Sequence, residues 1–154
     1  MKLFYLITSA SIVLASCQSA DKKQEPAQEP ASTELSFEQK NHILQDSANY
    51  TTIQWIDSTT QNIGKVNEGR IVEVTYRFKN TGTKPLVITE ATASCGCTVP
   101  EKPEQPIAPG TEGVIKAKFD SNGQHHGEAR KTVFVTANTN PQMNYLYFNL
   151  EVTE

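Results

Sequence analysis

The sequence predicts an all-β fold, an antiparallel β-sandwich of about seven strands. From residue 50 onward, short runs of alternating apolar and polar residues recur at roughly ten-residue spacing, separated by turn residues. No segment there has the length or period of the helices that connect parallel strands. The apolar positions suffice for one modest core, so we expect a single domain over residues 50–154.

Each expected strand follows from its own pattern. The clearest is 70–80, where apolar side chains occupy every second position. The others are 51–56, 85–92, 113–120, 128–138 and 143–153, and Thr98–Pro100 is a conditional further strand. Asn80-Thr81-Gly82 is expected to form a turn, in which Gly82 is able to take a positive φ. The predicted core contains Val72, Val74, Tyr76, Phe78, Phe119, Val133, Val135, Phe148 and Leu150.

The N-terminus has the pattern of a bacterial lipoprotein signal peptide over residues 1–16. Lys2 supplies the positive charge, and a mostly apolar run too short to span a bilayer follows it. Leu14-Ala15-Ser16-Cys17 resembles the lipobox, whose cysteine is acylated before cleavage. We therefore expect the mature chain to begin at Cys17 and to be held in the membrane of the cell envelope by several acyl chains. An ordinary secretory signal is the alternative.

The mature chain would be mildly acidic. The sequence has 14 basic and 17 acidic residues, and removal of Lys2 with the signal leaves 13 and 17. Because no basic run remains, we expect neither nucleic-acid binding nor membrane binding beyond the anchor. Gln18 after the lipidated cysteine is not the Asp that retains lipoproteins in the inner membrane, which favours the outer membrane, on its periplasmic or surface face.

Residues 17–49 are expected to link the anchor to the domain. Residues 18–34 contain the repeat QEPAQEPA and no large apolar side chain, so they should form a disordered tether. Ser36 and Gln39 fit a helix capping box. A short helix within 35–49 and a loosely packed end of the tether are both compatible with this segment.

Cys95-Gly96-Cys97 is the most unusual motif of the chain. With Cys17 acylated, these two cysteines form an even pair outside the cytosol, where disulfides persist. A bridge between them would close a very small ring and contribute little stability, so a redox-active pair is one reading. A strained bridge or a corner with buried thiols, without chemistry, is another.

A metal site is the third reading of this pair. Two thiolates can bind Zn²⁺ or Cu(I), and His125 and His126 are the clustered candidates for further ligands. The histidine loop and the cysteine corner fall at the same end of the sandwich only if Thr98–Pro100 forms a strand of its own. Two adjacent loop histidines are otherwise simply solvated.

Four elements carry a resemblance to a known family. They are Asn80-Thr81-Gly82, Pro85-Leu86, Ser94-Cys95-Gly96-Cys97-Thr98 and Ile107-Ala108-Pro109-Gly110. In these elements and their spacing the chain resembles the domain-of-unknown-function family 1573 from about Trp55 to Val152. The resemblance implies an immunoglobulin-like, Hydin-like domain on a bacterial lipoprotein of the Bacteroidetes type. It implies no activity and no cofactor.

Two classes of function are compatible with these features. No Gly-x-Ser-x-Gly nucleophile motif or Gly-rich phosphate loop occurs, so enzymatic activity is not expected. The first hypothesis is a non-catalytic envelope module that binds a protein or glycan partner, for which Tyr145 and Tyr147 on one strand face are candidates. The second is a thiol redox or copper- or zinc-handling lipoprotein that uses Cys95 and Cys97.

Replacing Cys17 with Ser tests the anchor directly. Because the acyltransferase modifies a thiol, the variant should stay unprocessed and be released or mislocalised. Mass spectrometry of the wild-type N-terminus should find acyl chains on Cys17. An unacylated N-terminus at another residue would exclude the lipoprotein.

Overall fold

The computed structural model describes residues 34–154. The expected signal peptide, Cys17 and tether residues 18–33 lie outside the described residues. A short helix and a 3-10 turn precede eight strands. The elements are α1 (Phe37–Gln45), η1 (Ser47–Asn49), β1 (Ile53–Trp55), β2 (Thr60–Asn67), β3 (Ile71–Asn80), β4 (Ile88–Ala93), β5 (Thr98–Glu101), β6 (Glu112–Asp120), β7 (Gly127–Ala137) and β8 (Met143–Thr153). Among these residues no helix is long and apolar enough to cross a bilayer.

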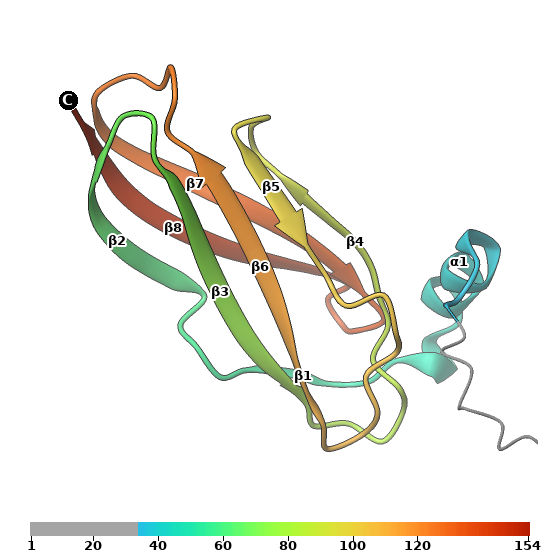
Figure 1. Cartoon of the computed structure of the whole chain (residues 1–154). Helices are drawn as coiled ribbons and strands as arrows, with labels where there is room; N and C mark the ends of the chain where they lie inside the picture. Colours follow the sequence, from blue (N-terminus) through green and yellow to red (C-terminus); the bar gives the residue numbers. More distant parts are fainter. Residues whose placement is uncertain (1–33) are drawn as a thin grey trace, which may run out of the picture. The chain divides into compact units, whose positions relative to one another are not determined.

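The strands form two four-stranded sheets that pack face to face (Figure 1). Their orders are β1-β3-β6-β5 and β2-β8-β7-β4, and the predicted β-sandwich is confirmed. One pair departs from the antiparallel rule, because β2 lies parallel to β8. Strand β2 was not predicted, since its polar residues and the bulge between Asn62 and Gly64 hide the alternation; Val66 is its one buried side chain.

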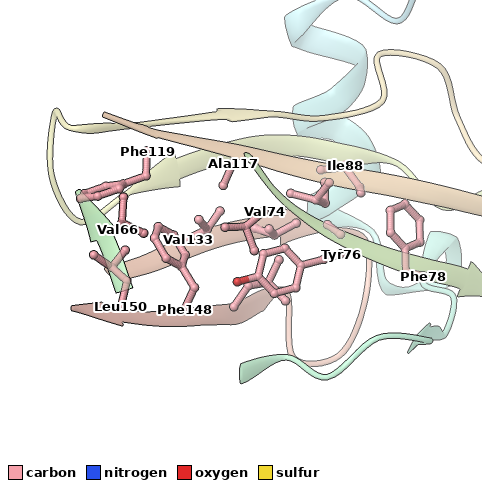
Figure 2. Close-up of a cluster of buried hydrophobic side chains, with 14 of the residues drawn as sticks. Val66, Val74, Tyr76, Phe78, Ile88, Ala117, Phe119, Val133, Phe148 and Leu150 are labelled. Carbon is pink, nitrogen blue, oxygen red and sulfur yellow. The ribbon is translucent and has the colours of Figure 1, made fainter. Parts of the chain in front are cut away.

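The core fills the space between the sheets. Figure 2 shows apolar side chains of both sheets pointing toward one another, and Phe119 meets Phe148 edge to face with ring centroids 5.9 Å apart. Eight of the nine predicted core residues are buried. Val72 is the exception: it is only partly buried, since it pairs with Phe119 near the end of the ladder, close to the β2–β3 turn.

One buried hydroxyl joins the two sheets. Tyr76 of β3 is fully buried, and its hydroxyl donates to the Tyr147 carbonyl of β8 at 2.8 Å. Burial raises the pKa of the Tyr76 phenol well above its usual range, so the group stays a neutral donor. Its hydrogen bond removes the cost of an unpaired polar group in the core.

Asn80 organises the loops that follow β3. Its fully buried amide donates to the carbonyls of Lys84 and Ile107 at 2.8 and 2.9 Å. The amide oxygen accepts from Gly82 N and from the Thr51 hydroxyl. Gly82 does not use the positive φ that glycine allows. A Cβ there would collide with the Thr51 side chain, so glycine is required by the close approach of the chain before β1.

Helix α1 confirms one of the two readings of residues 35–49. Ser36 and Gln39 form the expected capping box. No α1 residue is buried, and Phe37 is 78% exposed, so the helix is held by polar contacts. Gln142, between β7 and β8, donates to the Leu44 carbonyl at 2.7 Å, and Lys40 pairs with Glu104.

Phe78→Ala should destabilise the domain by about 3–5 kcal/mol, because the ring is fully buried against Trp55 and the Cα of Gly113. Ile71→Ala is the matched control on the same strand. Since Ile71 is 71% exposed, its loss should change stability by less than about 0.5 kcal/mol. Urea unfolding measures both, and a loss under about 1 kcal/mol for Phe78→Ala would refute the core assignment.

Candidate functional site

The Cys-Gly-Cys motif forms the corner where the chain crosses from one sheet to the other. Strand β4 ends at Ala93 in the β2-β8-β7-β4 sheet, and β5 begins at Thr98 in the opposite sheet. Ser94 N donates to the Thr132 carbonyl at 2.9 Å. On the far side of the corner, Asp120 N donates to the Cys97 carbonyl, also at 2.9 Å. Both ends of the motif are therefore fixed by backbone hydrogen bonds to different sheets.

A disulfide joins Cys95 and Cys97. Their Cα atoms are 5.3 Å apart, within the range that a bridge requires. Both residues are half-buried, and Cys97 packs against the hydrophobic core. The buried hydroxyl of Thr98 lies 3.6 Å from the Cys95 sulfur and 3.9 Å from the Cys97 sulfur, within reach of a weak hydrogen bond to either.

The two histidines do not join the cysteines in a ligand set. Strand β5 exists, so the corner and the histidine loop do fall at the same end of the sandwich (Figure 1). His126 instead lies 2.9 Å from the Glu68 carboxylate, and His125 is exposed. Both sulfurs are committed to the disulfide, and within residues 34–154 no group of three His, Cys, Asp or Glu side chains is arranged for a metal. A metal site shared by the two cysteines and the two histidines therefore stays a hypothesis, and the disulfide-bonded structure does not bring these ligands together.

A second candidate is the outer surface of the β2-β8-β7-β4 sheet. Alternation on these strands sends a set of aromatic and amide side chains outward. We call it the aromatic–amide face: Asn62, Arg130, Phe134, Tyr145, Tyr147 and Asn149. Tyr145 is 50% exposed, and Tyr147 is half-buried.

The aromatic–amide face is held together by contacts among its own members. Phe134 and Tyr145 meet edge to face at 5.9 Å, and the Arg130 guanidinium lies 4.2 Å from the Tyr147 ring centroid. Asn149 donates to the Asn62 side chain at 2.9 Å. An open hollow lies beside these amides, and its charged lining residues are Lys65, Glu128, Arg130 and Glu151, two of each sign.

The outer surface of the opposite sheet has a different character. Lys116 pairs with Glu73 at 3.1 Å, and Lys118 pairs with Glu101. Arg77 binds Asp57 through both carboxylate oxygens, and this guanidinium lowers the pKa of the Asp57 carboxyl. These ion pairs are exposed, so the face is a solvated surface rather than a site.

Part of the aromatic–amide face could be found from the sequence. Its alternation placed Tyr145 and Tyr147 on one side of the last strand, half-exposed, as they are. Arg130 and Phe134 were missed, although the alternation of β7 puts both on the outer side. Asn62 could not be found, because its strand was not recognised. Glu101 and Glu104 of the Pro-rich segment are solvated and salt-bridged, with no acid–base geometry.

The two sheets and the disulfide corner define the class: an immunoglobulin-like β-sandwich with a small disulfide ring at a sheet crossing. The chain belongs to the family described as "Protein of unknown function (DUF1573)", whose model matches residues 53–152. These bounds agree with the range expected from the sequence motifs. No match was found among curated proteins.

Two solved structures show the fold of this chain at low identity. A protein of unknown function from Porphyromonas gingivalis W83 superposes with a TM-score of 0.59 and 15% identity over 69% of this chain. The match covers 49% of that protein, so the chain spans about half its length. The ASH / PapD-like domain 7 of human CEP192 matches with a TM-score of 0.50 and 11% identity, over 97% of this chain and 99% of that domain.

Changing Cys95 and Cys97 together to Ser should cost at most about 2 kcal/mol of stability, because so short a loop constrains the unfolded chain little. The loss should therefore stay below that of Phe78→Ala in the same urea unfolding experiment. An equal or larger loss would show that the bridge holds the corner together.

Proposed function

We propose that this protein is a lipid-anchored module of the bacterial cell envelope that binds a partner through the aromatic–amide face. The anchor is Cys17, on the outer membrane, and the tether and α1 lead to the sandwich. The lipobox Leu14-Ala15-Ser16-Cys17 supports the anchor, and Gln18, in place of an inner-membrane retention Asp, supports the location. The role of the sandwich is binding rather than catalysis.

The observation that carries the binding role is the contrast between the two outer faces. One carries exposed ion pairs and single aliphatic side chains, and the other has three aromatic rings and two amides beside one exposed ion pair, Lys65–Glu151. Contact with solvent alone does not account for aromatic rings on an outer face. Exposed aromatic side chains beside polar groups are typical of a surface that binds a partner.

The partner that this chemistry fits is a neutral glycan. A sugar ring has an apolar C–H side, which stacks on a flat aromatic ring, and a rim of hydroxyls, which both donate and accept. Asn62 and Asn149 provide donors and acceptors side by side. Lys65 and Arg130 balance Glu128 and Glu151 in the adjoining hollow, which disfavours a strongly charged ligand.

A protein partner fits this face less well. Stable protein interfaces have an apolar core of closely packed anchors with a polar rim. Here Asn149, Asn62 and Arg130 continue directly from the tyrosines, so polar groups take up one end of the face and the rings are not surrounded by a polar rim. Burying them against protein would require a matched partner for each.

Binding to an array of neutral oligosaccharides, with the mature chain in detergent micelles, tests the proposal. Tyr145→Ala should weaken binding to the retained sugars about tenfold, the loss of one stacking ring. Asn149→Ala should weaken it similarly, through lost hydrogen bonds to hydroxyls. Ile71→Ala removes an exposed apolar side chain from the opposite sheet and should leave affinity unchanged.

Three outcomes would contradict the proposal that this face binds a neutral glycan. They are no binding to any neutral oligosaccharide, equal binding by wild type and Tyr145→Ala, and preference for acidic sugars. A purified envelope protein that binds wild type but not Tyr145→Ala would establish the face as a protein interface instead.

A further inference from the structure

Gly96 is the one glycine of this chain that its fold does not require. The chain has eight glycines. Five take a positive φ that other residues rarely adopt: Gly64, Gly69, Gly110, Gly123 and Gly127. At Gly82 and Gly113 a Cβ would collide with neighbouring atoms. At Gly96 neither reason holds, since its φ lies outside the left-handed region and a Cβ would meet nothing within 4 Å beyond its two neighbours, Cys95 and Cys97.

A glycine at this position adds no side chain to the exposed part of the disulfide ring. Gly96 is the middle residue of the ring that Cys95 and Cys97 close, and it is exposed. Any side chain there would be a substituent on this small ring, and no other residue would stand within 4 Å of its Cβ. The sequence separation of two residues also means that the bond restrains the unfolded chain little, so stability does not account for it.

The surroundings of the two sulfurs are asymmetric. Cys97 packs against the hydrophobic core, whereas Cys95 does not. The Thr98 hydroxyl lies within reach of both sulfurs, and Thr98 is 5% exposed. A buried hydroxyl that can donate to a sulfur stabilises the thiolate over the thiol.

We infer that Cys95–Cys97 is a thiol–disulfide exchange site for a dithiol partner that approaches over Gly96, with Thr98 as a positioning residue. This inference is independent of glycan binding, because the corner and the aromatic–amide face share no residue. It assigns Cys95 as the sulfur attacked and Cys97 as the leaving group.

The exchange balances with the partner dithiol alone. A partner thiolate attacks the Cys95 Sγ, and a mixed disulfide forms as the Cys95–Cys97 bond breaks. The bonding electron pair leaves on the Cys97 Sγ, where the Thr98 hydroxyl can donate a hydrogen bond. The second partner thiol, as thiolate, then attacks the partner's sulfur of the mixed disulfide, whose bond to the Cys95 Sγ breaks, and Cys95 leaves as a thiolate. The partner ends as a disulfide, and Cys95 and Cys97 take up the two protons that it releases.

The first experiment asks whether the folded protein exchanges. The mature chain in detergent micelles is mixed with dithiothreitol, or with a synthetic peptide that contains Cys-x-x-Cys, then quenched with iodoacetamide and analysed by mass spectrometry. Both dithiols should reduce the bridge while near-ultraviolet circular dichroism stays native. A bridge that is reduced only as the protein unfolds would overturn the inference and leave a structural staple.

Gly96→Val tests whether the partner reaches the disulfide over Gly96, and Thr98→Val tests whether the Thr98 hydroxyl stabilises the leaving thiolate. Gly96→Val should slow reduction of the bridge by the peptide at least about tenfold, because the added side chain hinders the approach of the larger reagent. Reduction by dithiothreitol should slow less. Thr92→Val, on the exposed side of β4, is the matched control and should leave both rates unchanged. Equal rates for Gly96→Val and wild type would refute the approach over Gly96.

Thr98→Val tests the hydroxyl while keeping the shape of the buried side chain. It should slow reduction by dithiothreitol about tenfold and raise the pKa of the released Cys97 thiol, followed by thiolate absorbance at about 240 nm. Thr98→Ser keeps the donor and should restore both. A thiol pKa that is the same in Thr98→Val and wild type would exclude the positioning role.

Discussion

Two sheets can share one core only if every strand points alternate side chains inward, and the rest of this structure depends on that constraint. On β3 and β8 it sends Tyr76 and Phe148 into the interior, where one hydroxyl ties the sheets together. The same period leaves each outer face free of the demands of packing. One face carries ion pairs and single aliphatic side chains, and the other carries rings and amides beside the Lys65–Glu151 pair.

A sandwich also requires segments that leave one sheet for the other, and these are held in two different ways. Near α1, the buried amides of Asn80 and Asn138 bind loop backbone: Asn138 accepts from Val87 N at 2.7 Å and donates to the Asn49 carbonyl. Among the described residues, no buried side-chain nitrogen or oxygen lacks a partner. At the β4–β5 corner, backbone hydrogen bonds flank a disulfide instead, so the crossing there does not depend on a buried amide.

The sequence was informative where a strand is both regular and half-buried. The alternation of β3 predicted its bounds and its inward side chains, and only Val72, beside the end of the ladder, is less buried than expected. Strand β2 could not be found because its burial comes from pairing with β8, at the other end of the domain sequence, and not from its own composition. The bridge between Cys95 and Cys97 was left open for a similar reason. The distance between them is set by Thr132 and Asp120, which hold the two ends of the motif from different sheets. The need for glycine at position 82 could not be read from the local sequence either, because the side chain that leaves no room for a Cβ there belongs to Thr51.

The two proposed sites lie at different places relative to the end of the sandwich that α1 contacts. Helix α1 contacts Gln142 and Glu104, at the end of the strands where β6 begins, and the cysteine corner lies where β6 ends (Figure 1). At about 3.3 Å per residue, β6 separates these ends by roughly 27 Å. The cysteine corner therefore lies at the opposite end of the strands from α1. The aromatic–amide face runs along the strands between the two ends, where an extended ligand could lie without covering the disulfide. The proposed binding on that face and the proposed exchange at the corner can thus proceed on the same molecule at the same time.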